Sequence, residues 1–129
     1  MGHKVSSIDQ LGSGPGFRKV RGPLGVTAFG VNAIVFPPGY DGFDHWHDEQ
    51  DELYFVHRGR ISVEVDGETH ELGPGGLLHV ESTTRRKVSN PFGGDAVLLV
   101  VGGKDGYVGR DGHLVDPDDL PRRQAFTSG

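Results

Sequence analysis

The apolar residues of this chain come in short runs that turn-forming residues separate. The runs span 26–36, 52–57, 61–65, 68–72, 77–80, 86–90 and 96–101. Residues 61–65 alternate between apolar and polar side chains, which is typical of a half-buried strand. That segment ends at Asp66-Gly67, a pair that suits a two-residue hairpin turn. No helical periodicity extends beyond two turns, so the spacing predicts a β-sandwich or a β-barrel.

The composition also favours strands joined by tight turns. Val and Ile number 18 and Ala only 4, and the 129 residues include 22 Gly and 8 Pro. Branched side chains pack well on a pleated sheet, and they lose rotamer freedom in a helix. The length suits one domain. We expect an N-terminal arm over 1–16, an all-β barrel over 17–103, and a C-terminal hairpin followed by a solvated tail over 104–129.

Charge and composition exclude several classes of protein. The formal net charge is −5, which has the wrong sign for a nucleic-acid-binding protein. No apolar run approaches the roughly 20 residues that a membrane helix needs. The chain has no cysteine, so disulfides and thiolate ligands are excluded. The N-terminal residues carry no apolar stretch of the secretory type, and the predicted location is the cytoplasm.

The segment 39–52 carries the chemistry of the chain. His45 and His47 are separated by one residue, so in a strand both imidazoles lie on the same face. Glu52 begins the next apolar run and can add a carboxylate oxygen. Two imidazoles and one carboxylate suit a divalent transition metal and leave coordination positions open. The simpler alternative is a solvated acidic loop that carries two histidines by chance.

The spacing of this segment resembles the first motif of the cupins. Gly39, His45, His47, Glu52 and Gly59 stand at the positions of that motif, and the resemblance covers roughly 26–101. It implies a small jelly-roll barrel, which is a double-stranded β-helix of a single domain. It also implies that the two histidines and the glutamate are metal ligands, and that the two glycines occupy turns.

The second cupin motif is degenerate in this chain. Alignment on Gly75 and Asn90 places Glu81 and Thr83 where the family has proline and glycine, and Arg86 where it has the fourth metal ligand, a histidine. A guanidinium has no lone pair to offer a metal. Three possibilities remain open. Arg86 can face the open coordination positions and orient an anionic substrate, it can pair with Glu52 in a metal-free pocket, or His79 can replace the missing ligand.

Strand parity assigns the remaining candidates. Tyr54 and Val56 share the parity of Glu52, so we expect both to face the barrel interior and Tyr54 to contribute to the active site. Trp46 and His57 fall on the outer face, and we interpret His70 as a surface residue.

These observations predict a cupin that binds one divalent metal ion, Fe, Mn, Ni or Zn, through His45, His47 and Glu52. We expect a small-molecule enzyme of dioxygenase or isomerase type and a homodimer. The alternative is a non-catalytic, metal-free cupin that binds a sugar or another metabolite.

Overall fold

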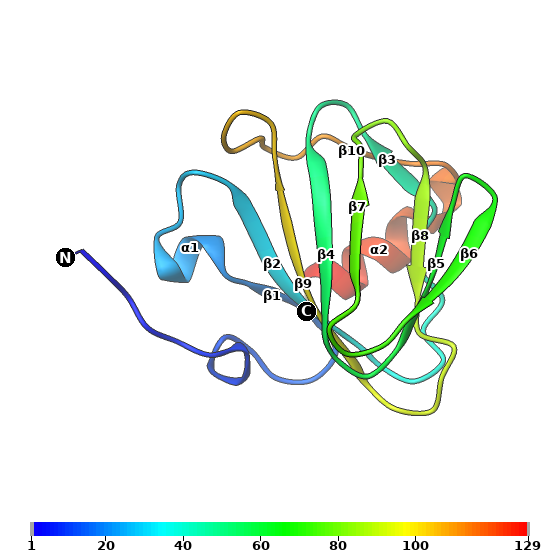
Figure 1. Cartoon of the computed structure of the whole chain (residues 1–129), viewed down its shortest axis with the longest axis horizontal. Coiled ribbons are helices and arrows are strands. Elements are labelled where there is room, and N and C mark those ends of the chain that lie inside the picture. The colour runs from blue at the N-terminus through cyan, green and yellow to red at the C-terminus, as the bar shows by residue number, and fades with distance from the viewer. Residues whose placement is uncertain (1, 129) are drawn as a thin grey trace.

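The structure is a computed structural model, and it describes residues 2–128. Two five-stranded antiparallel sheets face each other (Figure 1). The first has the strand order β1-β2-β9-β4-β7, made of Gly16–Lys19, Gly30–Phe36, Ala96–Gly103, Asp51–Arg58 and Leu77–Val80. The second has the order β10-β3-β8-β5-β6, made of Gly112–Leu114, His45–His47, Arg86–Ser89, Ile61–Val65 and Glu68–Leu72. The predicted all-β jelly-roll barrel is confirmed.

The predicted strands agree closely with the observed ones. β5, β6 and β7 have the predicted limits, and β4, β8 and β9 differ from prediction by one or two residues at an end, whereas β2 begins at Gly30, four residues after the predicted start of its run. Asp66 and Gly67 both have positive φ angles, as the predicted hairpin turn requires, and the turn sets Val65 opposite Glu68. Gly39 and Gly59 also have positive φ, which fits the turn positions that the cupin resemblance implies.

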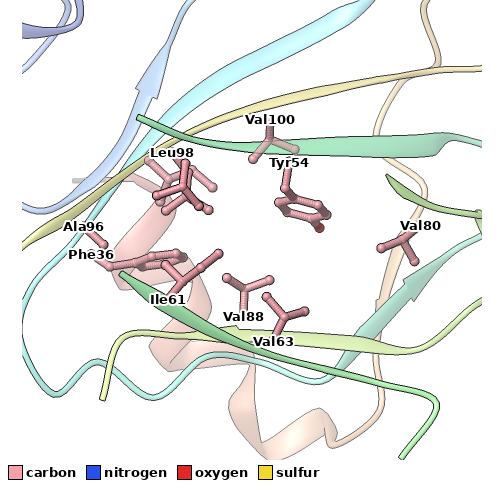
Figure 2. Packing of buried hydrophobic residues seen from close by; sticks show 11 residues of the cluster. Phe36, Tyr54, Ile61, Val63, Val80, Val88, Ala96, Leu98 and Val100 are labelled. Carbon is pink, nitrogen blue, oxygen red and sulfur yellow. The ribbon is translucent and has the colours of Figure 1, made fainter. Parts of the chain in front are cut away.

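The core lies between the two sheets. Figure 2 shows Tyr54, Leu98 and Val100 of the first sheet facing Ile61, Val63 and Val88 of the second. Tyr54 is 4% exposed and Val56 is fully buried, whereas Leu53, Phe55 and His57 are exposed. The parity prediction for β4 is therefore confirmed, and it places one face of this strand inside the barrel.

Both ends of the chain pack on the barrel. A short 3-10 helix (η1, Ile8–Gln10) lies within the predicted N-terminal arm, and a helix of one turn (α1, Arg21–Leu24) follows β1. Ile8, Leu11 and Leu24 cover the outer face of β2. At the other end, a 3-10 helix (η2, Pro117–Asp119) leads into a longer helix (α2, Leu120–Ser128). No helix within residues 2–128 is long and apolar enough to cross a membrane.

The structure differs from the hairpin and solvated tail expected over 104–129. β10 pairs with β3 rather than with a neighbouring segment of its own, and α2 packs against β1. Phe126 stacks on Phe36 and Tyr40 and meets Phe17 edge to face. Three aromatic partners far away in sequence hold a helix too short and polar to be recognised by its own pattern.

Candidate metal centre

The two histidines of β3 present the same ring nitrogen to the barrel interior. His45 Nδ1 lies 3.0 Å from the carbonyl oxygen of Phe43, and His47 Nδ1 lies 2.8 Å from Asp111 Oδ1. In the neutral rings both Nδ1 atoms donate to these oxygens, which leaves each Nε2 with a lone pair. Partners of this kind fix the tautomer and the orientation of histidines that bind metals.

Glu52 approaches the histidines from the opposite sheet. Its side chain is 12% exposed, and Oε1 lies 3.2 Å from His47 Nε2. The hydroxyl of Tyr54 donates a hydrogen bond of 2.6 Å to the same oxygen. One ligand atom from each of His45, His47 and Glu52 lies within 4.8 Å of the others, a spacing that allows the three to hold one metal ion.

The contact between His47 and Glu52 requires a positive charge. When Asp111 holds the proton on Nδ1, the lone pair of His47 Nε2 faces a carboxylate oxygen. Within the described residues this buried nitrogen completes no hydrogen bond of good geometry. Two facing lone pairs repel, and either a proton or a metal ion between them removes the repulsion. The donor set of this chain therefore fits a divalent cation.

The pKa directions agree with this interpretation. Burial alone lowers the pKa of His47, but its contact with the Glu52 carboxylate and its hydrogen bond with Asp111 outweigh burial and raise it. Burial raises the pKa of Glu52, yet contact with His47, Tyr54 and Arg86 lowers it overall. Burial lowers the pKa of His45 and so favours the neutral ring that a metal needs. Burial also raises the pKa of Tyr54 well above its usual range, so its hydroxyl stays protonated.

Asp111 is a residue of the site that the sequence analysis missed. Besides His47, its carboxylate accepts hydrogen bonds from the backbone N–H groups of Glu49 and Gln50 and from the side-chain amide of Gln50. These donors outweigh burial and lower the pKa of Asp111. Asp111 immediately precedes β10, in a segment without a recognisable motif. Nothing in the sequence there indicates a contact with His47, because that contact depends on the pairing of β10 with β3.

Arg86 lies behind Glu52 and is fully buried. Its Nη1 donates to the carbonyl oxygens of Ser82 and Thr84 at 3.0 and 2.8 Å. Its Nη2 lies 3.4 Å from Glu52 Oε1. The strand register sets Arg86 opposite His45, the position at which the cupin pattern places the fourth ligand. The pair with Glu52 that was one of the three possibilities is therefore present in this arrangement.

The other histidines and Trp46 lie away from the centre. His79 is exposed and sits opposite Leu53, on the outer face of the first sheet, so it does not replace the missing ligand. His57 and His70 are exposed, as predicted. Trp46 stacks on His113 with ring centroids 4.3 Å apart.

A cavity of about 630 Å³ opens onto the candidate centre. His45, His47, Glu52 and Tyr54 line it, and α2 and the loop before β10 form much of its outer wall. Arg86 is not among the residues that line it, so a molecule in the cavity meets Glu52 and Tyr54 and does not reach the guanidinium.

Comparison with known proteins identifies a family for this chain. The family model "Cupin domain" matches residues 33–102, which is more than half of the chain. No curated protein matches the sequence.

Solved structures give the same fold. A cupin protein from Bacteroides fragilis is 22% identical, with a TM-score of 0.70 over 85% of this chain and 91% of its own. A sugar phosphate isomerase of the cupin superfamily from Silicibacter pomeroyi is 27% identical, with a TM-score of 0.64 over 68% and 58%. The DMSP lyase DddQ from Ruegeria pomeroyi is 21% identical, with a TM-score of 0.63 over 70% and 45%. The chain spans less than two thirds of the last two proteins.

Proposed function

The chain belongs to the cupin family, and from that premise we propose that it binds one divalent transition metal ion and acts on a small molecule in the barrel. His45, His47 and Glu52 would hold the ion. When bound, it supplies Lewis acidity and open coordination positions, which serve dioxygen chemistry with iron and isomerisation or hydrolysis with zinc. We propose a reaction of dioxygenase or isomerase type. The similarity to a cupin sugar phosphate isomerase supports the second.

One observation carries this proposal: the His47 ring lies between two carboxylates, with Nε2 3.2 Å from Glu52 Oε1 and Nδ1 2.8 Å from Asp111 Oδ1. A structural histidine buried for packing has no need of a facing carboxylate and a second carboxylate behind it. This relay of charged groups is typical of a ligand histidine.

Tyr54 and Arg86 have different roles in the proposal. Tyr54 lines the cavity, and its protonated hydroxyl is placed to donate to a substrate oxygen or to Glu52. Arg86 is sealed from the cavity, so we assign it a positioning role: it holds Glu52 through Nη2 and the 82–84 turn through Nη1. A permanent positive charge beside Glu52 weakens the attraction of that carboxylate for a metal and does not remove it.

The ion pair of Arg86 with Glu52 favours a second candidate function. In a metal-free protein, the proton on His47 and the charge of Arg86 neutralise Glu52, and the cavity acts as a binding site for a metabolite without turnover.

Metal content distinguishes the two functions. We expect protein purified without chelator to carry close to one equivalent of iron, manganese, nickel or zinc by plasma mass spectrometry. The variant His45→Ala/His47→Ala should lose it. His70→Ala is the matched control, because it removes an exposed imidazole from β6 and should retain the metal.

A metal-free preparation in which calorimetry detects no binding of added Fe(II), Mn(II), Ni(II) or Zn(II) would overturn the metalloenzyme and leave the binding module. If metal is bound, oxygen uptake with candidate substrates separates a dioxygenase from an isomerase.

A further inference from the structure

The lining of the cavity is enriched in basic residues. Lys19, Arg21, Arg110 and Arg123 all line it. Four of the 13 basic residues of the chain therefore lie on this wall, against two of its 18 acidic residues, Glu52 and Asp111. The protein has a net charge of −5, so this enrichment runs against its overall composition.

The two acidic residues of the wall are already neutralised within the protein. Glu52 contacts His47 and Arg86, and Asp111 accepts four hydrogen bonds. Of the cations, Arg21 lies over the ring of Tyr107 at 3.8 Å and is committed there. In the part of the chain that the structure describes, the side chains of Lys19, Arg110 and Arg123 make no hydrogen bond or ion pair. These three charges are available to a ligand.

The strand register shows how far Lys19 lies from the candidate metal centre. Lys19 pairs with Asn32, Asn32 with Val100, and Val100 with Tyr54, so the four residues form one row across the first sheet. All four line the cavity. Three strand spacings of about 4.8 Å put Lys19 roughly 14 Å from Tyr54 along the sheet. A molecule that reaches both ends is therefore elongated.

The register places one polar and one apolar residue, Asn32 and Val100, between Lys19 and Tyr54. Apolar side chains line the cavity beside this row: Ile34 and Phe36 lie farther from Glu52 on β2, and Val88 and Phe126 are contributed by β8 and α2. A pocket with an apolar body and a few charged groups at one end fixes the orientation of an amphiphilic ligand.

From this arrangement we infer that the ligand is an elongated anionic amphiphile, whose carboxylate, sulfate or phosphate binds Lys19, Arg110 and Arg123 while its uncharged end lies at His45, His47 and Glu52. The inference rests on the proposed function for the identity of the inner end. It assigns recognition of the anion to Lys19, Arg110 and Arg123, which we call the cationic mouth of the cavity. Arg86 takes no part in this recognition.

The test compares two fluorescent probes that share an aromatic body. 8-Anilinonaphthalene-1-sulfonate carries the anion, and N-phenyl-1-naphthylamine lacks it. We expect the sulfonate to bind more tightly to the wild-type protein, and its affinity to fall about tenfold in Lys19→Gln/Arg123→Gln and in high salt, because two partly solvated charges are lost or screened. The affinity of the uncharged probe should stay the same in this variant and in high salt.

Arg58→Gln/Arg60→Gln is the matched control: it removes two exposed charges outside the cavity and should change neither affinity. Circular dichroism and thermal unfolding verify that each variant is folded. Equal affinities for the two probes, or a sulfonate affinity that Lys19→Gln/Arg123→Gln does not alter, would overturn the inference. Metal content is measured on the same samples. Selective sulfonate binding by a metal-free protein supports the cationic mouth and contradicts only the metal centre.

Discussion

Replacing Asp111 by Asn tests whether the hydrogen bond behind His47 prepares a metal ligand. The amide has the shape of the carboxylate but keeps one acceptor oxygen, and its nitrogen donates. Each carboxylate oxygen of Asp111 accepts two hydrogen bonds: Oδ1 from His47 and the Gln50 side chain, and Oδ2 from two backbone N–H groups. Either orientation of the amide therefore loses two hydrogen bonds and places a donor against donors.

The magnitude follows from those two contacts. A hydrogen bond to a charged group contributes about 1.5–3 kcal/mol, and the Asp111 side chain is only 10% exposed, so water replaces little of the loss. Since the two bonds share one acceptor oxygen, we take the lower value for each and expect about 3 kcal/mol of lost stability. For a chain of this length that lowers Tm by about 10 °C.

Metal affinity should fall as well, by about 10- to 100-fold. When the amide nitrogen faces His47 Nδ1, that nitrogen must accept, and the ring proton moves to Nε2, the atom that a metal requires. Isothermal titration with Zn(II) and thermal unfolding measure the two effects. Asp48→Asn is the control, because Asp48 pairs with His113 at an exposed site where the contribution is at most about 1 kcal/mol.

The pH dependence of stability gives an independent check on Asp111. Its pKa is lowered in the folded protein, so its carboxylate stabilises the fold above the unfolded pKa of about 4, and this contribution is lost as pH falls toward the folded pKa. The stability difference between wild type and Asp111→Asn should widen as pH falls through the titration of His47, whose pKa the Asp111 hydrogen bond raises, and it should narrow below pH 4. An unchanged Tm together with unchanged Zn(II) affinity in Asp111→Asn would refute the reasoning.

Three further predictions concern other parts of the site. Arg86→His places an imidazole opposite His45, so we expect Zn(II) to bind more tightly by titration calorimetry; unchanged affinity would show that the second motif is misaligned. The raised pKa of His47 means that a proton competes with the metal below a pH somewhat above 6.5, so the apparent Kd should rise about tenfold per pH unit there, and a Kd that is flat from pH 7.5 to 5.5 would exclude imidazole ligation. Phe126→Ala removes the aromatic contacts of α2 and should cost about 2 kcal/mol in chemical denaturation, less than a fully buried ring, whereas Phe29→Ala, at an exposed ring, should cost under 1 kcal/mol.

Local sequence signals were sufficient for most of the barrel. Alternation over 61–65 and the Asp66-Gly67 turn define β5 and β6, because hairpin register depends on residues that are adjacent in the chain. The alternation of side chains along β4 likewise predicted that Glu52 and Tyr54 lie on the same face, because it depends only on residues of one strand. The pairing of β10 with β3 and the docking of α2 depend on contacts between distant segments, such as Phe126 with Phe17. No local pattern encodes them.

The same distinction explains Asp111 and the cationic mouth of the cavity. Asp111 lies 64 positions from His47, within a stretch rich in Gly and Asp that carries no periodic pattern. Lys19, Arg110 and Arg123 lie on β1, a loop and α2, and only the closed barrel brings these elements around one cavity. From the sequence alone, each of the three is expected to be an ordinary solvent-exposed charge.

Arg86 shows where sequence reasoning must stop at alternatives. The cupin resemblance implied that Arg86 stands at an interior position, and its full burial agrees with that. Whether it meets a substrate or Glu52 depends on the length of two side chains from different sheets. The 3.4 Å contact with Glu52 places the guanidinium behind the carboxylate, where it shares Oε1 with Tyr54 and His47. A carboxylate with three partners at one oxygen keeps its geometry whether or not an ion is bound. Arg86 therefore preorganises Glu52, and its positive charge partly offsets the negative charge of that carboxylate. Anion recognition is then left to the mouth of the cavity, where the unpaired cations lie.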